Sequence, residues 1–252
     1  MTAPLRRRTV PMLAPLVASA VAISLALPAF VPAESSAQEC ALCSVKPTVR
    51  RWLEYLEEGR SRKAWRLMTK QSRRTIGGFD AFKNESSAWA EGWGAWASAR
   101  KRDFEVRVIA PMDDDAASVV TITGIVAQEG PWRRSAAALP VITHDGVTKV
   151  DPVHGRAEIR PVRPSGDETL KRRPRFKAIV KRIRARYNSV FFVIKGSTLD
   201  PQRAKLDRIG RRSYRATLRW PRRLSVGPHV LTISTWGRHG FKATAVRFKV
   251  ER

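Results

Sequence analysis

The chain has 252 residues, 43% of them hydrophobic, so it can bury substantial cores and is neither a disordered nor a fibrous protein. It carries 48 Lys and Arg against 22 Asp and Glu, so its net charge is +26. A charge this positive favours a polyanionic partner. Residues 151–252 hold 27 of these cations and only 7 carboxylates. Because Arg outnumbers Lys by 35 to 13, a compositional bias explains the surplus as well as a binding site does.

The first 37 residues have the layout of a secretory signal peptide. Arg6 to Arg8 supply the positive start, residues 13–31 are apolar and rich in Ala, and small residues suited to cleavage follow. Two prolines interrupt the apolar run and no basic stop follows it, which disfavours a permanent anchor. We therefore expect cleavage after a segment of residues 1–37 and an exported protein, secreted or associated with the cell envelope, without a transmembrane anchor.

Cys40 and Cys43 form a Cys-Ala-Leu-Cys sequence directly after the expected cleavage region. The four histidines lie far away along the chain, so the spacing does not complete a metal site, and we expect neither metal nor cofactor. A thioredoxin-like redox pair needs a strand-to-helix junction within a βαβ unit, which this stretch lacks. Outside the cytoplasm the pair predicts a short local disulfide, with intermolecular pairing as the alternative.

Apolar residues spaced three and four apart predict three helices in the next fifty residues. The first is expected over residues 48–58 with Pro47 near its start, and a glycine ends it. A serine can cap the second, over residues 61–68. The third begins near residue 78 and ends before the basic residues 100–102, whose cations suit a helix C-terminus.

Three tryptophans lie on one face of the third expected helix, because their spacing is i, i+4 and i+7. The simplest interpretation is that they pack the helix onto a sheet as core. The alternative is an open apolar pocket or docking surface, where aromatic side chains are also favoured. The candidate pocket residues are Trp89, Trp93, Trp96, Phe82 and Phe104.

After residue 102 the hydrophobic period changes to two, which predicts β-strands. Phe104, Val106 and Val108 alternate with charged residues, which indicates a half-buried strand whose charges face solvent. Gly124 marks a bend or bulge in the following strand. Three more strands are expected, at residues 118–127, 132–142 and 147–150. The prediction is an α+β domain with helices packed on one face of a curved antiparallel sheet.

Four short stretches carry a family resemblance: AWRLM at 64–68, SRRTI at 72–76, GFDAF at 78–82 and DGVTKVD at 145–151. They resemble the nuclear transport factor 2-like superfamily, and within it the N-terminal domain of some bacterial penicillin-binding transpeptidases. The resemblance covers residues 48–153 and implies a cone-shaped α+β fold. It implies no particular activity, since this superfamily includes enzymes, binding proteins and scaffolds.

Residues 154–173 show no hydrophobic period and contain several Pro and Gly, so they are expected to form a linker. Residues 174–252 alternate short apolar runs with Gly, Pro and basic turns, which predicts five to seven antiparallel strands in a β-sandwich. The stretch LSVGPHVLTI at 224–233, with the final strand, resembles bacterial immunoglobulin-like domains. The expected strands are 176–183, 189–194, 213–220, 229–236 and 243–250.

Two basic clusters in this second domain are candidates for polyanion binding. Alternatively, residues 181–186 form an edge strand guarded by Lys and Arg, with Ile183 and Ala185 on the other face. Nucleic acid is disfavoured, because the chain is expected to be exported and contains no recognised nucleic-acid-reading motif. The candidate residues are Arg172, Arg173, Arg175, Lys181, Arg182, Arg184 and Arg186.

These patterns predict an exported, non-catalytic cell-envelope protein of binding or scaffold type. Its basic module would associate with anionic cell-wall polymer or an envelope protein, and its first module would contact a protein or small ligand. Catalysis is disfavoured because no Gly-x-Ser-x-Gly elbow is present and Glu91 lies off the Trp face. Two alternatives stay open: a cone-fold enzyme with a buried acid/base group, and a secreted nucleic-acid binder.

Overall fold

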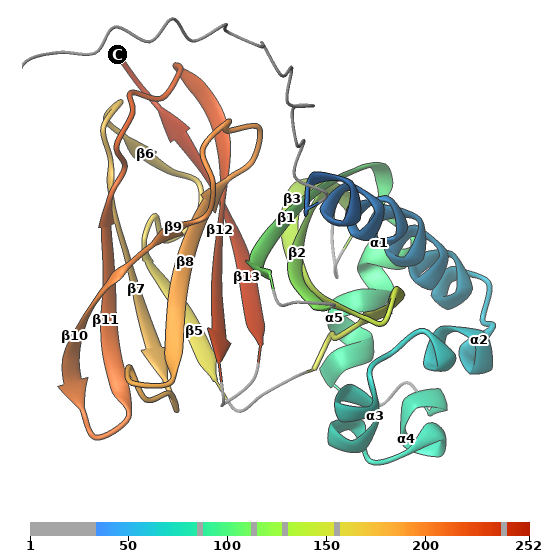
Figure 1. Ribbon diagram of the computed structural model, residues 1–252. Coiled ribbons are helices and arrows are strands. Elements are labelled where there is room, and N and C mark those ends of the chain that lie inside the picture. The colour runs from blue at the N-terminus through green and yellow to red at the C-terminus, as the bar shows by residue number, and fades with distance from the viewer. Residues whose placement is uncertain (1–33, 85–87, 112–114, 128–130, 154–156, 238–240) are drawn as a thin grey trace, which may run out of the picture. The chain divides into compact units, whose positions relative to one another are not determined.

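The computed structural model describes residues 34–84, 88–111, 115–127, 131–153, 157–237 and 241–252 (Figure 1). Over these residues the protein is a mixed α+β structure, in which N-terminal helices precede mostly antiparallel strands in three sheets. Residues Glu34–Arg252 form one compact unit. The predicted signal peptide lies almost wholly outside the described residues. Within them, no helix combines the length and apolar character that crossing a membrane requires.

The second helix starts at residue 61 as predicted, and the first ends at Glu57, one residue before its predicted end. The prediction that the first helix starts at residue 48 is wrong, because α1 begins at Glu34 and contains Pro47 in its interior. The single third helix predicted from residue 78 is wrong too, since α4 and α5 occupy that stretch as separate helices. The helices are α1 (Glu34–Glu57), α2 (Ser61–Arg66), α3 (Lys70–Ile76), α4 (Phe79–Lys83) and α5 (Ala88–Ala97).

Cys43 lies on α1 as a free and exposed thiol. Cys40 belongs to the same helix, three residues earlier, and its side chain is outside the described ones. The disulfide between them therefore stays a prediction about the oxidised protein.

The first sheet is antiparallel and has the strand order β1-β2-β3-β4. Its register shifts in β1 between Arg100 and Asp103, directly opposite Gly124 in β2. A Cβ at Gly124 would lie 3.2 Å from the carbonyl oxygen of Arg100 and 3.4 Å from the Trp96 ring, so glycine permits this close approach. The irregularity predicted at Gly124 thus lies in the neighbouring strand. The strands are β1 (Arg100–Pro111), β2 (Asp115–Val126), β3 (Arg133–His144) and β4 (Val147–Val150).

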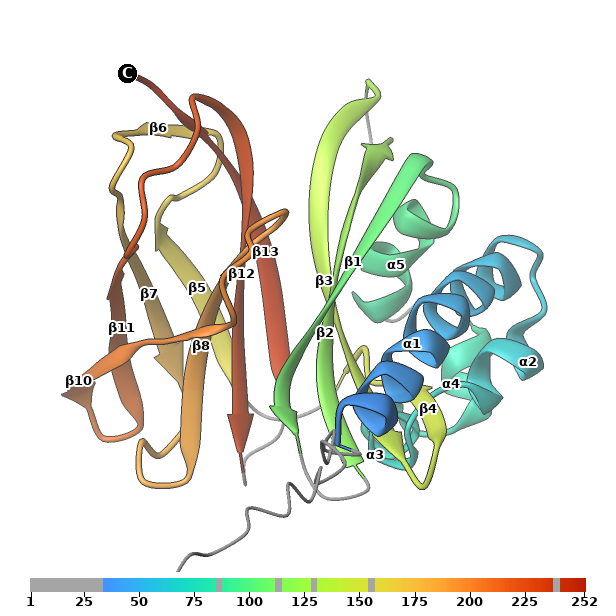
Figure 2. The ribbon, with the colours of Figure 1, turned by 45° about the horizontal axis from the view of Figure 1, so that its top comes forward.

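Helices α1 and α5 cover one face of this sheet (Figure 2). The core between them includes Trp52 and Leu53 from α1, both fully buried, with Ile122 and Leu139 from the strands. Fully burying side chains of this size stabilises a fold by about 1.5–3 kcal/mol each. The predicted packing of helices on the sheet is therefore confirmed for this face.

The other face of the first sheet is buried as well, against the five-stranded sheet of the C-terminal half. Ile109 and Val119 share a core there with Phe241 and Ala243. The N–H of Gly196 donates a 2.6 Å hydrogen bond to Glu105. The prediction that the charged face of β1 points to solvent is wrong for this part of the strand, because a second sheet covers it.

The C-terminal half consists of a four-stranded sheet, β10-β11-β7-β5, and a five-stranded sheet, β6-β13-β12-β8-β9. Strand β6 pairs in parallel with β13, the last strand of the chain, and the other pairs are antiparallel. The strands are β5 (Glu158–Arg163), β6 (Glu168–Leu170), β7 (Arg175–Lys181), β8 (Asn188–Ile194), β9 (Gln202–Arg203), β10 (Lys205–Gly210), β11 (Ser213–Arg219), β12 (Gly227–Gly237) and β13 (Lys242–Val250).

These two sheets enclose one aromatic-rich core. The ring of Phe176 lies edge-on to Trp220 and Phe248, with ring centroids 5.9 and 5.6 Å away, and stacks against Phe192 at 6.1 Å. The alternation of buried and exposed residues along β7 confirms the predicted strand. Such a core can hold the two sheets without a disulfide staple.

Two predictions for this half are wrong. Residues 154–173 are not a plain linker, because they contain β5 and β6. Residues 181–186 are not an edge strand, because β7 ends at Lys181 and lies between β11 and β5. Ile183 is nevertheless fully buried, as its alternation with the charged residues predicts.

A buried polar junction ties the helices to the end of the first sheet. Asp151 follows β4 and is fully buried, together with Ser72 of α3. One carboxylate oxygen of Asp151 accepts hydrogen bonds of 2.5 Å from the hydroxyls of both Thr69 and Ser72. Thr69 also caps α3, because its hydroxyl oxygen accepts a hydrogen bond from the N–H of Ser72. This group replaces water around a carboxylate that the fold has buried.

Lys242 of β13, which interacts electrostatically with Asp151, makes the stability of the protein depend on pH. Burial lowers the pKa of its ammonium below the ordinary 10.5, and the Asp151 carboxylate acts in the opposite direction. The folded protein thus releases this proton at a lower pH than the unfolded chain does. We expect the free energy of unfolding to rise, relative to a Lys242→Met variant, as the pH increases toward 10.5. Urea unfolding of both proteins across that range measures the difference, and a difference that falls contradicts the assignment.

Candidate polyanion-binding surface

Four of the five predicted pocket residues have described side chains, and these lie in or against the core of the helical half. Phe82, Trp96 and Phe104 are 2%, 5% and 5% exposed. Trp93 is half-buried and meets Trp52 edge-on at 5.6 Å. The side chain of Trp89 is outside the described ones. Trp96 belongs to this core and Trp93 packs against it, so both contribute to packing.

The predicted polyanion-binding residues are all exposed, but β7 separates them into two groups. Arg172, Arg173 and Arg175 lie at its start, and the other four lie at or beyond its end. Seven residues of extended strand span roughly 20 Å. Arg172 is also engaged, because its Nε donates a 3.0 Å hydrogen bond to the carbonyl oxygen of Leu224. The seven residues therefore do not form one cluster.

A larger basic surface lies on the outer side of the four-stranded sheet. In β7, Phe176, Ala178 and Val180 point into the core, so the alternate residues point outward. The same holds for β11, whose Ala216 and Leu218 pack inward. We call this surface the basic sheet face. It comprises Arg160, Arg163, Arg175, Lys177, Lys181, Lys205, Arg215 and Arg219.

The register places these cations side by side. Arg163 pairs with Lys177, and Lys177 pairs with Thr217, which in turn pairs with Lys205. One row across four strands thus carries three positive charges. At the end of β7, Arg175 pairs directly with Arg219.

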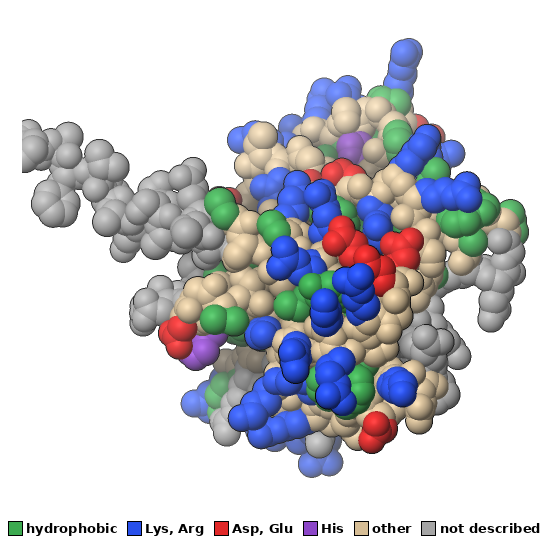
Figure 3. All heavy atoms as spheres, turned by 90° about the vertical axis from the view of Figure 1, so that its right-hand side faces the viewer, with side chains coloured by type: hydrophobic (Ala, Val, Ile, Leu, Met, Phe, Trp, Pro, Cys, Tyr) green, Lys and Arg blue, Asp and Glu red, His purple; other side chains and the backbone are tan. Residues whose placement is uncertain are grey.

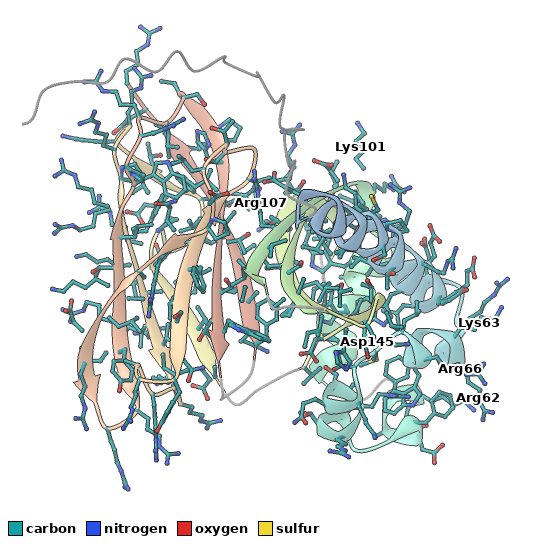
Figure 4. The ribbon with its side chains drawn as sticks, viewed as in Figure 1. Arg62, Lys63, Arg66, Lys101, Arg107 and Asp145 are labelled. Atoms are coloured by element: carbon teal, nitrogen blue, oxygen red, sulfur yellow. The ribbon has the colours of Figure 1, made fainter. Side chains whose placement is uncertain are left out.

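Like charges directly opposite one another destabilise a sheet. Such neighbours imply that the basic sheet face gains stability when an anion neutralises it, because bound negative charge removes the repulsion. Figure 4 shows long side chains with nitrogen ends projecting from the outer side of this sheet.

Carboxylates offset part of this charge, because Glu158 stands opposite Lys181 and Asp207 opposite Arg215 in the register. Glu158 contacts Arg182 at 3.2 Å, Asp207 contacts Lys205 at 3.1 Å, and Glu168 contacts Arg163 at 3.4 Å. Six cations of the face have no carboxylate within 4.0 Å among the described residues. They are Arg160, Arg175, Lys177, Lys181, Arg215 and Arg219.

Sequence reasoning found two members of the basic sheet face, Arg175 and Lys181, and missed the other six. Arg160 and Arg163 lay in the stretch predicted as a linker. The alternation of basic and apolar residues in RFKAIVK contained the signal for Lys177. Arg215 and Arg219 show a similar spacing, but only the register reveals that they lie beside β7.

A second basic stretch lies in the helical half. Residues 60–74 contain seven Lys and Arg and no carboxylate. Figure 3 shows basic side chains spread over this side of the molecule, with a group of acidic ones among them. Figure 4 shows Arg62, Lys63 and Arg66 reaching outward from α2. Arg62 lies over the ring of Phe79 and Lys63 over that of Tyr55. Two of these cations therefore already make cation–π contacts within the protein.

No group of three or more His, Cys, Asp or Glu in the described part of the chain is arranged to hold a metal ion. Exposed guanidinium and ammonium groups can bind anions through charge-assisted hydrogen bonds. No protein-family model matches this chain, and neither does any curated protein.

Proposed function

We propose that the protein is an exported, non-catalytic cell-envelope protein whose basic sheet face associates with an anionic envelope polymer. We also propose that residues 48–153 form a nuclear transport factor 2-like cone and that strands β5 to β13 form an immunoglobulin-like sandwich. The resemblance in the sequence, the helices packed on one face of an antiparallel sheet, and the two sheets around one core support them.

One observation carries the proposal: Arg163 stands opposite Lys177 and Arg175 opposite Arg219 on the basic sheet face, and six of its eight cations have no carboxylate within 4.0 Å among the described residues. A repeating polyanion matches this arrangement, because successive anionic groups can follow a row of cations across the strands. Arg is suited to phosphate and carboxylate groups, which its guanidinium can bind through two parallel hydrogen bonds. A compositional excess of Arg does not by itself align charges in rows.

The test uses the purified protein, isolated bacterial cell wall and long-chain inorganic polyphosphate as a defined polyanion. Replacing Lys177, Arg215 and Arg219 together by Ala should weaken binding at least tenfold at low salt. It should also make the dependence of binding on salt shallower, by about 2 in the log–log slope for three lost contacts. A salt titration of polyphosphate binding measures both.

The matched control removes the same number and types of charge from α2. Arg62, Lys63 and Arg66 replaced together by Ala should change binding less than threefold. If both triple variants weaken binding equally, net charge alone drives the association and the basic sheet face has no special role. Binding of the natural protein that is indifferent to salt contradicts the proposal directly.

A further inference from the structure

A groove of about 440 Å³ lies where the first sheet meets the five-stranded sheet, within the compact unit. Strands β1, β2 and β3 line one side of it, and β12, β13 and the turn after β8 line the other. Figure 2 shows both sets of strands. Its volume falls in the range of small-molecule sites, about 300–1,000 Å³. None of its strands belongs to the sheet that carries the basic sheet face.

Four cations line this groove and no carboxylate does: Lys101, Arg134, Lys195 and Arg247. Two of them are held in place. Lys195 contacts Asp103 at 2.5 Å, and Arg247 donates a 2.5 Å hydrogen bond to the carbonyl oxygen of Arg134. The hydrogen bond from Lys195 lowers the pKa of the Asp103 carboxyl below its ordinary 3.8, so this pair stays charged.

The other two cations, Lys101 and Arg134, have no carboxylate within 4.0 Å in the described part of the chain. Lys101 adopts a left-handed backbone conformation, φ 51°, at the bulge opposite Gly124. A non-glycine residue held in this region costs about 1–3 kcal/mol, and such residues concentrate at functional sites. Figure 4 shows Lys101 reaching outward from the start of β1. The fold thus includes a cation in the lining of the groove at a residue with a strained backbone.

The remaining lining fits a ligand that carries more than a charge. Thr123 and Ser135 offer hydroxyls, and Ile125, Pro228 and Val230 offer apolar surface. Gly124 forms part of the wall without a side chain. Hydroxyls beside apolar patches suit the hydroxyl groups and C–H faces of a sugar ring, and the cations suit a phosphate.

We infer that this groove binds a sugar phosphate, with Lys101 and Arg134 contacting the phosphate group. A free metabolite and a sugar-phosphate unit within a polymer present the same chemistry to it. The inference rests on different residues from the proposed function, so either can fail without the other.

The test measures binding of glucose 1-phosphate, glucose and inorganic phosphate to the purified protein by calorimetry. Glucose 1-phosphate should bind saturably and at least tenfold more tightly than either of the other two. Equal affinity for phosphate would show that an adventitious anion suffices, and absence of saturable binding would overturn the inference. Competition by a polymer built of sugar phosphates, against the free compound, distinguishes the two sources.

The deciding variant replaces Lys101 by Gly together with Arg134 by Ala. It should weaken glucose 1-phosphate binding at least tenfold while leaving the thermal midpoint unchanged or higher, because glycine relieves the strain at φ 51°. The matched control, Lys177→Ala with Arg215→Ala on the basic sheet face, should leave this binding within twofold. Unchanged affinity in the groove variant contradicts the assignment.

Discussion

Replacing Asp151 by Ala should destabilise the protein by about 3–5 kcal/mol, because it removes two hydrogen bonds to a charged group, each worth about 1.5–3 kcal/mol. The carboxylate accepts hydrogen bonds from the hydroxyls of Thr69 and Ser72, both at 2.5 Å. Without it these hydroxyls lose their acceptor, and Lys242 loses the negative charge that opposes its desolvation. Urea unfolding followed by tryptophan fluorescence measures the loss.

Asp151→Asn provides the matched control. Its amide oxygen can still accept a hydrogen bond, so it should lose clearly less stability than Asp151→Ala. Ser72→Ala removes one of the two donors and should cost about 1–2 kcal/mol. A loss below about 1 kcal/mol in the Ala variant would mean that the junction contributes little to stability.

Gly237→Ala should cost about 2–4 kcal/mol, because it combines a strained backbone with a steric clash. Gly237 has φ 150° and pairs with Asn188 at the end of β12. A Cβ there would lie 1.9 Å from the carbonyl oxygen of Tyr187 and 2.8 Å from the Cα of Asn188. Backbone atoms cannot turn away as the end of a side chain can, so β12 and β8 must separate locally.

Gly92→Ala is the same substitution in a different setting. An added Cβ at Gly92 meets nothing within 4 Å, and the residue lies inside α5. It should therefore stabilise the protein by up to about 1 kcal/mol through higher helix propensity. Thermal unfolding of both variants makes the comparison, and a Gly237→Ala protein as stable as the natural one would contradict the geometry at Asn188.

Alternation of apolar and polar residues located the strands well, because it reports a local property that a single strand already possesses. It failed for β5, whose sequence EIRPVR has a proline and three charged residues, with Ile159 alone packed against the core. It failed in another way for β1, where Ile109 is buried although it lies on the face predicted to meet solvent. That face is covered by a sheet that begins far along the chain, which local pattern does not report.

The helices were harder to predict for a similar reason. Trp93 and Trp96 do lie on one helix, and Trp96 is core as the simplest interpretation predicts. Small residues such as Gly92 and Gly94 lower helix propensity, so tertiary contacts decide where α5 begins and ends.

The candidate surfaces depend even more on long-range pairing. Arg175 and Arg219 are neighbours only because β11 pairs with β7 in one register. The groove needs strands from both halves of the chain. Charge composition predicted that a basic surface exists in the second half, and the pairing of strands decides which cations share it.

The contribution of β13 to two separate cores bears on how the protein folds. β13 contributes Phe248 to the core between the two C-terminal sheets and Ala243 to the core against the first sheet. Both cores therefore need contacts between segments that are far apart in the sequence, and such contacts form slowly. Until then the earlier strands keep apolar faces uncovered, a state in which chains aggregate. Deleting β13 would therefore uncover apolar side chains of two cores at once.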